Sequence, residues 1–131
     1  MAHRKSPARL AKDARAAHFR ALSARQAAVH ALPWDAAAAL ELALVGRVVL
    51  PSSPDYDQAR QESNPAFQSY PQLIVYCVCE NDVLECLAVA RRYQLWVAVR
   101  CGGHSTGGYS VNNGMVVDLS EMRGVVLDRA T

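Results

Sequence analysis

The chain has 131 residues and a mass of 14.3 kDa, and 51% of its residues are apolar and 20% are charged. This balance excludes wholesale disorder and fits one modest domain, and the absence of any run of about 18 uncharged apolar residues argues against a membrane-spanning helix. The formal net charge is +2, but residues 1–26 carry seven basic residues and one acid, whereas residues 27–131 carry seven and eleven. The basic head (residues 1–26) and the acidic body (residues 27–131) therefore differ in the sign of their net charge.

The basic head is rich in Ala, Arg and Leu, and residues 6–31 contain no Gly, so a weakly amphipathic helix or a partly ordered tail is predicted. Its basic face could contact nucleic acid or an anionic membrane, but Phe19 is its one aromatic residue. A solvated extension is favoured, and neither partner is predicted. Because basic residues alternate with Ala, the head lacks the apolar core of a signal peptide, and a cytoplasmic location is expected.

The next part of the chain predicts two helices, a strand and a loop. In order, these are a helix at 36–43, a strand at 47–50, a short helix at about 54–61 and a loop at 62–72. Asp35 is expected to cap the first helix, which Gly46 ends. Ser53 is a suitable N-cap for the second helix, with Pro54 at its first position, where the missing N–H group costs nothing.

The following part predicts a parallel sheet. The elements are a strand at 73–78, a helix from Asn81 to about 92, a strand at 96–99 and two more strands at 115–119 and 125–128. The run at 73–78 is apolar throughout, which is typical of a strand buried on both faces. Strand, helix and strand in succession form a βαβ unit, so the strands at 73–78 and 96–99 are expected to be parallel. The helix is expected to bury Val83, Leu84, Leu87, Ala88 and Ala90.

Four cysteines occur, namely Cys77, Cys79, Cys86 and Cys101. Cys77 and Cys79 lie two residues apart and are interpreted as small buried side chains rather than as halves of disulfides. A zinc site would draw on Cys77, Cys79, Cys101 and His104, but the C-x-C spacing is poor for tetrahedral zinc, and no metal site is predicted.

The most informative segment is a glycine-rich loop at residues 100–110, where four of the seven glycines lie within residues 102–108. Ligands of open α/β sheets bind beyond the carboxyl ends of the strands, and glycines let backbone N–H groups converge on an anion. Ser105 and Thr106 add hydroxyl donors, and Arg100 is expected to help hold anionic groups. The loop therefore suits the pyrophosphate of a dinucleotide, although it matches neither G-x-x-x-x-G-K-[ST] nor G-x-G-x-x-G. Gly102 and Gly103 are expected to have positive φ or to lie where a side chain would clash.

Three motifs in this part of the sequence occur in a known order. Arg-x-Gly-Gly-His-Ser stands at 100–105, a later Gly and Ser are Gly108 and Ser110, and Asp-Leu-Ser-x-Met stands at 118–122. Together they resemble the FAD-binding domain of the vanillyl-alcohol oxidase and p-cresol methylhydroxylase superfamily, and within it the berberine bridge enzyme-like oxidases. The resemblance covers roughly residues 44–128.

The resemblance implies an α/β (α+β) fold with FAD as its cofactor. Residues 1–42 would be a basic, Ala-rich helical extension, and residues 43–131 the incomplete amino-terminal part of the FAD-binding domain, containing the βαβ unit. In the family, the loop histidine is joined covalently to the 8α carbon of the flavin, a role that falls on His104. The implied cofactor-binding residues are Arg100, Cys101, Gly102, Gly103, His104, Ser105, Thr106, Gly108, Tyr109 and Ser110.

The family's second α/β portion, its substrate domain and its catalytic base have no counterpart in this sequence, so no catalytic residue is assigned. The expected function is the FAD-binding portion of an FAD-linked oxidase, in which a hydride passes from a small-molecule substrate to flavin N5 once the enzyme is complete. A complementing carboxyl-terminal portion is a possible partner. The alternative is a non-catalytic, truncated remnant that does not bind flavin tightly.

Overall fold

The structure is a computed structural model, and it describes residues 31–129. The predicted helix or tail at 6–31 lies outside the described residues, apart from its last residue. Within the described part, the elements are α2 (Trp34–Ala43), β1 (Arg47–Val49), α3 (Tyr56–Ala59), β2 (Leu73–Tyr76), α4 (Glu80–Tyr93), β3 (Val97–Arg100) and β4 (Met115–Asp118).

The four strands form one mixed sheet in the order β1-β2-β4-β3. β4 pairs in parallel with β2 on one side and with β3 on the other, while β1 pairs antiparallel with β2. The prediction that the two strands of the βαβ unit are parallel is therefore confirmed, and β4 lies between them. The predicted α/β class is confirmed as well.

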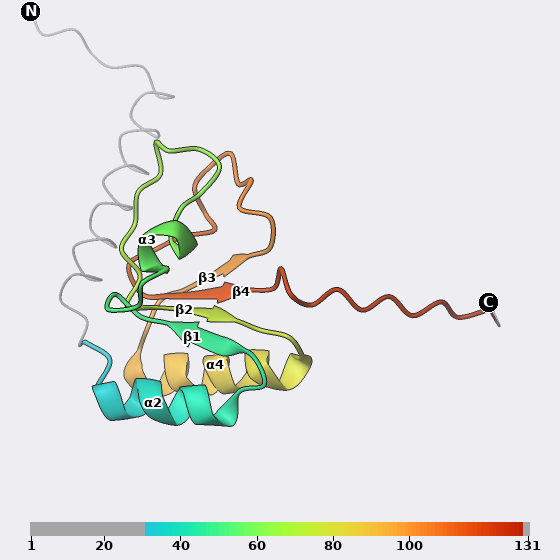
Figure 1. The fold of residues 1–131 in the computed structure, drawn as a ribbon, viewed down its shortest axis with the longest axis horizontal. Coiled ribbons are helices and arrows are strands. Elements are labelled where there is room, and N and C mark those ends of the chain that lie inside the picture. Colours follow the sequence, from blue (N-terminus) through green and yellow to red (C-terminus); the bar gives the residue numbers. More distant parts are fainter. Residues whose placement is uncertain (1–30, 130–131) are drawn as a thin grey trace, which may run out of the picture.

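The sheet is covered by different kinds of structure on its two faces (Figure 1). Helices α2 and α4 cover one face, while α3 and the two long loops at 60–72 and 101–114 lie over the other. Because successive side chains of a strand point to opposite faces, each strand contributes to both layers. The helix-side cluster contains Leu40, Leu73, Val75, Cys77, Cys86, Ala90, Leu95, Met115 and Val117. The loop-side cluster contains Val49, Tyr56, Ala59, Ile74, Ala98, Val111 and Val116.

A buried carboxylate joins the connections around β1 and α4. Asp82 is fully buried, and its two oxygens accept hydrogen bonds from the backbone N–H groups of Val45 (2.9 Å), Gly46 (3.1 Å) and Val78 (2.9 Å). Burial alone raises the pKa of Asp82, but these donors and the Cys79 thiol outweigh it and hold the pKa below its ordinary value. At Gly46 a Cβ atom would overlap the Tyr76 carbonyl oxygen, so this tight connection requires glycine.

The helix starts differ from the predictions. The N-cap of α2 is Pro33 and that of α4 is Cys79, and neither helix has a side-chain capping bond. Asp35, and Asn81, which the sequence also predicts as the cap of the helix that follows it, lie inside the first turns instead, where Asp35 still favours the helix dipole. Both predicted caps are therefore wrong, and at α4 it is Asp82, one residue after Asn81, that accepts the Val78 N–H group before the helix.

The buried face of α4 also differs from the expected one. Asp82, Cys86 and Ala90 are its buried residues, each four positions after the last, and Val83 and Val89 flank them. Leu84, Leu87 and Ala88 are exposed, which corrects their assignment to the core. The helix is rotated toward the small residues because Cys86 and Ala90 let it approach the sheet closely.

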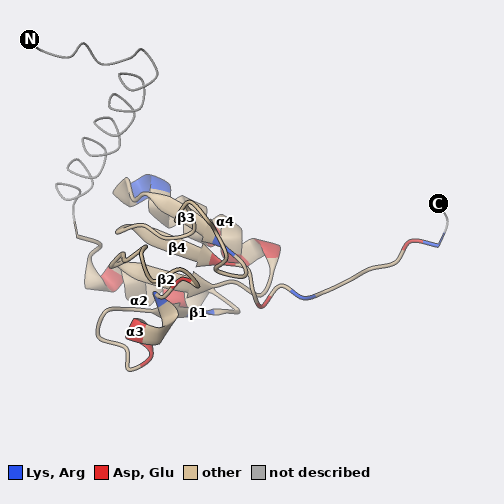
Figure 2. Ribbon diagram, turned by 90° about the horizontal axis from the view of Figure 1, so that it is seen from above, with Lys and Arg blue, Asp and Glu red and all other residues tan. Residues whose placement is uncertain are grey.

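The predicted strand at 125–128 does not form. Val125, Val126 and Leu127 are 92%, 95% and 75% exposed, and the tail runs away from the sheet beyond the carboxyl end of β4 (Figure 2). A strand needs a neighbour for its backbone hydrogen bonds, and in the described part of the chain nothing pairs with this segment. Across residues 31–129, no helix has the length and apolarity needed to cross a membrane.

The four cysteines are free thiols. Cys77 and Cys86 are buried with their Sγ atoms 3.9 Å apart, Cys79 is half-buried and Cys101 is exposed. The interpretation as small buried side chains is thus confirmed for Cys77, whereas Cys79 is only partly buried. Burial raises the pKa of both the Cys77 and Cys86 thiols, which keeps them protonated.

Candidate functional site

A row of polar side chains crosses the sheet at the carboxyl ends of the parallel strands. In the sheet register Arg47 is opposite Tyr76, Tyr76 is opposite Asp118, and Asp118 is opposite Arg100. The row lies on the same face as the loop-side cluster, two residues along each strand from its members Val49, Ile74, Val116 and Ala98. The polar row therefore marks the point where this face changes from the apolar loop-side cluster to polar side chains.

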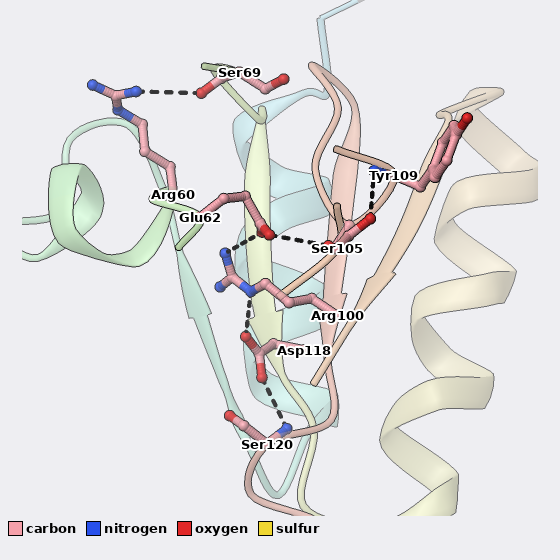
Figure 3. Close-up of polar contacts among 9 residues, drawn as sticks. Arg60, Glu62, Ser69, Arg100, Ser105, Tyr109, Asp118 and Ser120 are labelled. Carbon is pink, nitrogen blue, oxygen red and sulfur yellow. Dashed lines mark hydrogen bonds and ion pairs between the residues drawn. The ribbon is translucent and has the colours of Figure 1, made fainter. Parts of the chain in front are cut away.

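Arg100 of this row lies between two buried carboxylates, Asp118 of the row and Glu62 of the segment after α3 (Figure 3). Its Nε atom is 2.6 Å from Asp118 Oδ2, and its Nη1 atom is 3.8 Å from Glu62 Oε1. The other Asp118 oxygen, Oδ1, accepts a hydrogen bond from the backbone N–H group of Ser120 at 2.9 Å. The guanidinium is thus already neutralised by protein carboxylates.

Two glycines of the loop adopt the left-handed region that favours glycine. Gly103 has φ 68° and Gly108 has φ 69°. At Gly102, φ is not positive, but an added Cβ would lie 3.0 Å from His104 Nδ1 and crowd that side chain. At Gly108 an added Cβ would overlap the Phe67 ring. Of the two expected alternatives, Gly103 thus has positive φ, and Gly102 does not but is a position where a side chain would be crowded.

Hydrogen bonds close the loop and tie it to the segment after α3. The backbone N–H group of Tyr109 donates to Ser105 Oγ (3.1 Å), and that of Gly108 donates to the Ser105 carbonyl (3.3 Å). The N–H group of Ser63 donates to the Gly103 carbonyl (3.0 Å). These bonds give the loop a compact turn at its tip and a fixed attachment near its start.

The N–H groups of residues 101–107 point to a binding role for this loop. None of these seven backbone N–H groups donates a hydrogen bond to another residue in the range 31–129. Cys101, His104, Thr106 and Tyr109 are exposed, Ser105 is half-buried, and all lie on the accessible part of the loop. Unused N–H donors on consecutive residues form a favourable surface for an anion.

A polar cavity of about 350 Å³ opens beside the start of the loop. The polar row lines it together with residues 101–103 and residues of the α3 segment. Arg47 stacks over the Tyr76 ring at 4.3 Å and pairs with Asp55 at 2.8 Å. Burial raises the pKa of the Tyr76 phenol, while Arg100 opposes the shift, so this hydroxyl stays protonated at neutral pH.

Among the predicted site residues, Arg100, Gly103 and Ser110 come together, because all three approach Glu62. Glu62 itself, with Arg47, Tyr76 and Asp118, was missed as a site residue. Asp118 carried a signal, since it belongs to the motif at 118–122. Glu62 carried none, because it stands in a segment with no periodicity.

Comparisons with known proteins agree with this geometry. Residues 71–131 match the family model described as an FAD binding domain. An FAD-linked oxidoreductase of Bacillus subtilis, YgaK, is 39% identical over 87 residues, which are 66% of this chain and 19% of YgaK. The (R)-6-hydroxynicotine oxidase of Paenarthrobacter nicotinovorans is 31% identical over 93 residues, which are 70% of this chain and 20% of the oxidase.

This chain contains part of the FAD-binding domain of the FAD-linked oxidoreductases. It spans about a fifth of the length of the curated relatives that it matches. Among solved structures, the 6-hydroxy-D-nicotine oxidase of Arthrobacter nicotinovorans superposes with a TM-score of 0.63 at 30% identity, covering 68% of this chain and 20% of that one. A berberine bridge enzyme-like protein of Physcomitrella patens has a TM-score of 0.62 at 23% identity, covering 71% and 21%, which shows the same fold. The family resemblance and the FAD-binding fold are thus confirmed.

Proposed function

We propose that this FAD-linked oxidoreductase chain holds the pyrophosphate of FAD on the loop at residues 101–107. The observation that supports the proposal best is the set of seven unused backbone N–H donors at the carboxyl end of β3. The adjoining polar cavity offers space for further polar parts of the cofactor. When bound in a complete enzyme, FAD supplies a two-electron acceptor that takes a hydride from a small-molecule substrate at flavin N5.

The loop residues have separate tasks in this proposal. Gly103 lets the backbone turn through the left-handed region, so that consecutive N–H groups face one anion. Ser105 Oγ accepts the Tyr109 N–H group, which leaves the hydroxyl proton free to be donated to a phosphate oxygen. The exposed hydroxyl of Thr106 is a second donor of the same kind.

His104 is the residue we propose for covalent attachment of the flavin. Its imidazole is exposed on the loop, and the missing side chain of Gly102 leaves room beside Nδ1. A bond from an imidazole nitrogen to the 8α carbon replaces one N–H and one C–H bond. The two protons leave to solvent, and the two electrons pass to the isoalloxazine and then to dioxygen as the oxidant.

FAD binding is tested by titrating the purified chain with FAD and following the quenching of flavin fluorescence. Saturable binding is expected for the wild type. Gly103→Val is expected to weaken it at least tenfold, by about 1.4 kcal/mol or more. Gly124→Val is the matched control, because no atom lies within 4 Å of a Cβ built there. Absence of saturable binding in the wild type, or equal binding by Gly103→Val, would overturn the proposal in favour of a remnant that does not bind flavin.

Covalent attachment is tested separately on protein purified after expression with FAD. Acid denaturation and removal of small molecules are expected to leave flavin fluorescence on the wild-type polypeptide and none on His104→Ala. Flavin that washes away from both proteins would contradict the covalent role of His104. Such a result leaves the first experiment to decide whether FAD is bound at all.

A further inference from the structure

We propose that Glu62 is a positioning residue for the FAD loop, holding residues 100–110 in the geometry that receives the cofactor. The proposal rests on the proposed FAD site for its ligand, but the effect of Glu62 on the loop is measurable without FAD. Nothing in the sequence around Glu62 indicates this role, because the residue lies in the irregular segment between α3 and β2.

Glu62 holds the end of the loop through Ser110. Its side chain has no exposed surface, and its Oε2 atom accepts a hydrogen bond from Ser110 Oγ at 3.0 Å. Ser110 is buried as well, and it is 48 residues away in the sequence. A hydrogen bond to a charged group is stronger than one between neutral groups, so this contact fixes the end of the loop firmly.

Glu62 also holds the start of the loop through Arg100. Its other oxygen, Oε1, lies 3.8 Å from Arg100 Nη1, and Asp118 pairs with the Nε atom of the same guanidinium. Neither Glu62 Oε1 nor Arg100 Nη1 makes a hydrogen bond with another described residue. Arg100 therefore acts on the cofactor by fixing the loop, since its charge is shared between two protein carboxylates.

A third contact lies between these two ends. The Ser63 N–H group donates to the Gly103 carbonyl, and a Cβ added at Gly103 would lie 3.8 Å from Glu62 Oε2. The segment at residues 62–63 thus contacts the loop at Arg100, Gly103 and Ser110, and the seven unused N–H groups lie within that span. Without these contacts, binding would have to order the loop at an entropic cost.

The chemistry of Glu62 supports positioning rather than simple packing. Burying a carboxylate is costly, and apolar residues of similar volume often replace buried ion pairs without loss of stability. A core with no function at this point would be served equally well by an apolar side chain. A carboxylate, by contrast, has two oxygens that can contact Arg100 and Ser110 at the same time.

The test compares Glu62→Ala and Glu62→Gln with the matched control Glu80→Gln, whose carboxylate is exposed on α4. In the ligand-free chain, ¹⁵N relaxation is expected to show lower order parameters for residues 101–109 in Glu62→Ala, and unchanged values in β2 and β4. The Kd for FAD is expected to rise about tenfold for Glu62→Ala and to stay within about twofold for Glu80→Gln. Glu62→Gln retains an acceptor for Ser110, so its loop order parameters and its Kd for FAD are expected to lie between those of Glu62→Ala and Glu80→Gln.

The outcomes separate this inference from the proposed function. Unchanged loop order parameters in both Glu62 variants, or an unchanged Kd when the wild type binds FAD, would overturn the positioning role. A wild type that binds no FAD overturns the proposed function, and the relaxation measurement still decides the role of Glu62. A merely structural role lowers the melting temperature without altering loop order at temperatures where β2 and β4 stay folded. If Glu62→Ala fails to fold, Glu62→Gln decides the question.

Discussion

The two faces of the sheet use the same four strands for different purposes. In β4, Met115 and Val117 point into the helix-side cluster, whereas Val116 and Asp118 point toward the loops. The helix side is closed by two helices and is apolar apart from the fully satisfied Asp82. The loop side begins as an apolar core and ends in the polar row. Because successive side chains of a strand point to opposite faces, Val117 contributes to the helix-side cluster and the next residue, Asp118, contributes to the polar row.

The buried charges on the two sides differ in how completely they are satisfied. Asp82 accepts three backbone hydrogen bonds at ordinary distances. On the loop side, two carboxylates share one guanidinium, and two of the polar atoms involved have no hydrogen-bond partner within residues 31–129. A fully satisfied charge stabilises a fold, whereas an incompletely satisfied group is typical of a site that serves another purpose.

The largest expected effect is the loss of the buried charge on the helix side. Asp82→Ala removes the acceptor for three backbone N–H groups and is expected to lower the free energy of unfolding by about 5 kcal/mol. Urea unfolding followed by circular dichroism measures this change. Glu121→Ala, at an exposed carboxylate, is the control and is expected to change it by less than about 0.5 kcal/mol. An Asp82→Ala protein that unfolds at the same urea concentration as the wild type would contradict the stabilising role of Asp82.

The next effect concerns the buried charges on the loop side. Arg100→Met leaves Glu62 and Asp118 buried without their cation and is expected to cost about 3–5 kcal/mol. The triple variant with Glu62→Leu and Asp118→Leu is expected to recover most of this stability, because no uncompensated charge remains. It should nevertheless fail to bind FAD. Recovery of FAD binding together with stability would show that the loop side is only a core.

The smallest effect is an alkaline loss of stability on the helix side. Burial raises the pKa values of Cys77 and Cys86 above the ordinary 9.0, so the folded state retains protons that the unfolded state has lost. Their contribution is fully present below pH 9 and is lost as the pH rises toward the folded pKa values. Urea unfolding is expected to show falling stability as the pH rises above about 9, where the thiols of the unfolded chain ionise.

Matched variants isolate the two thiols responsible. The slope of stability against pH should flatten in a Cys77→Ala and Cys86→Ala double variant and persist in Cys101→Ala, whose thiol is exposed. The measurements stay below about pH 10, because above it the tyrosines of the unfolded chain also ionise while Tyr56 and Tyr76, whose pKa values are raised from 10.0, keep their protons. A slope that is identical in all three proteins would rule out the buried thiols as its source.

The sequence was sufficient where the information is local. The continuous apolar run at 73–78 predicted β2, and the succession of strand, helix and strand predicted a parallel pair. It was insufficient where a partner from elsewhere decides the outcome. The run at 125–128 has strand composition, but in the described structure it has no neighbouring strand. The position of β4 between β2 and β3 likewise depends on packing of the whole sheet.

The same distinction holds for the site. The glycine-rich loop was found from its composition and from its place after a strand, and Gly103 adopts the expected backbone conformation. Glu62 was missed because its meaning depends on Ser110 and Arg100, which lie far along the chain. Arg100 was expected to face an anionic ligand, and the carboxylates that surround it become visible only when the sheet places Asp118 beside it.

The polar row also bears on how the strands find their alignment. Asp118 faces Arg100 only when β4 pairs with β3 in the observed register. A slip of one residue would turn Asp118 toward the apolar residues beneath α4 and would bring Val117 to the place opposite Arg100. Both changes would bury a charge without a counter-ion, so a misaligned sheet is destabilised once water is excluded from it. The ion pair beside the glycine-rich loop thus also favours the observed register of β3 and β4.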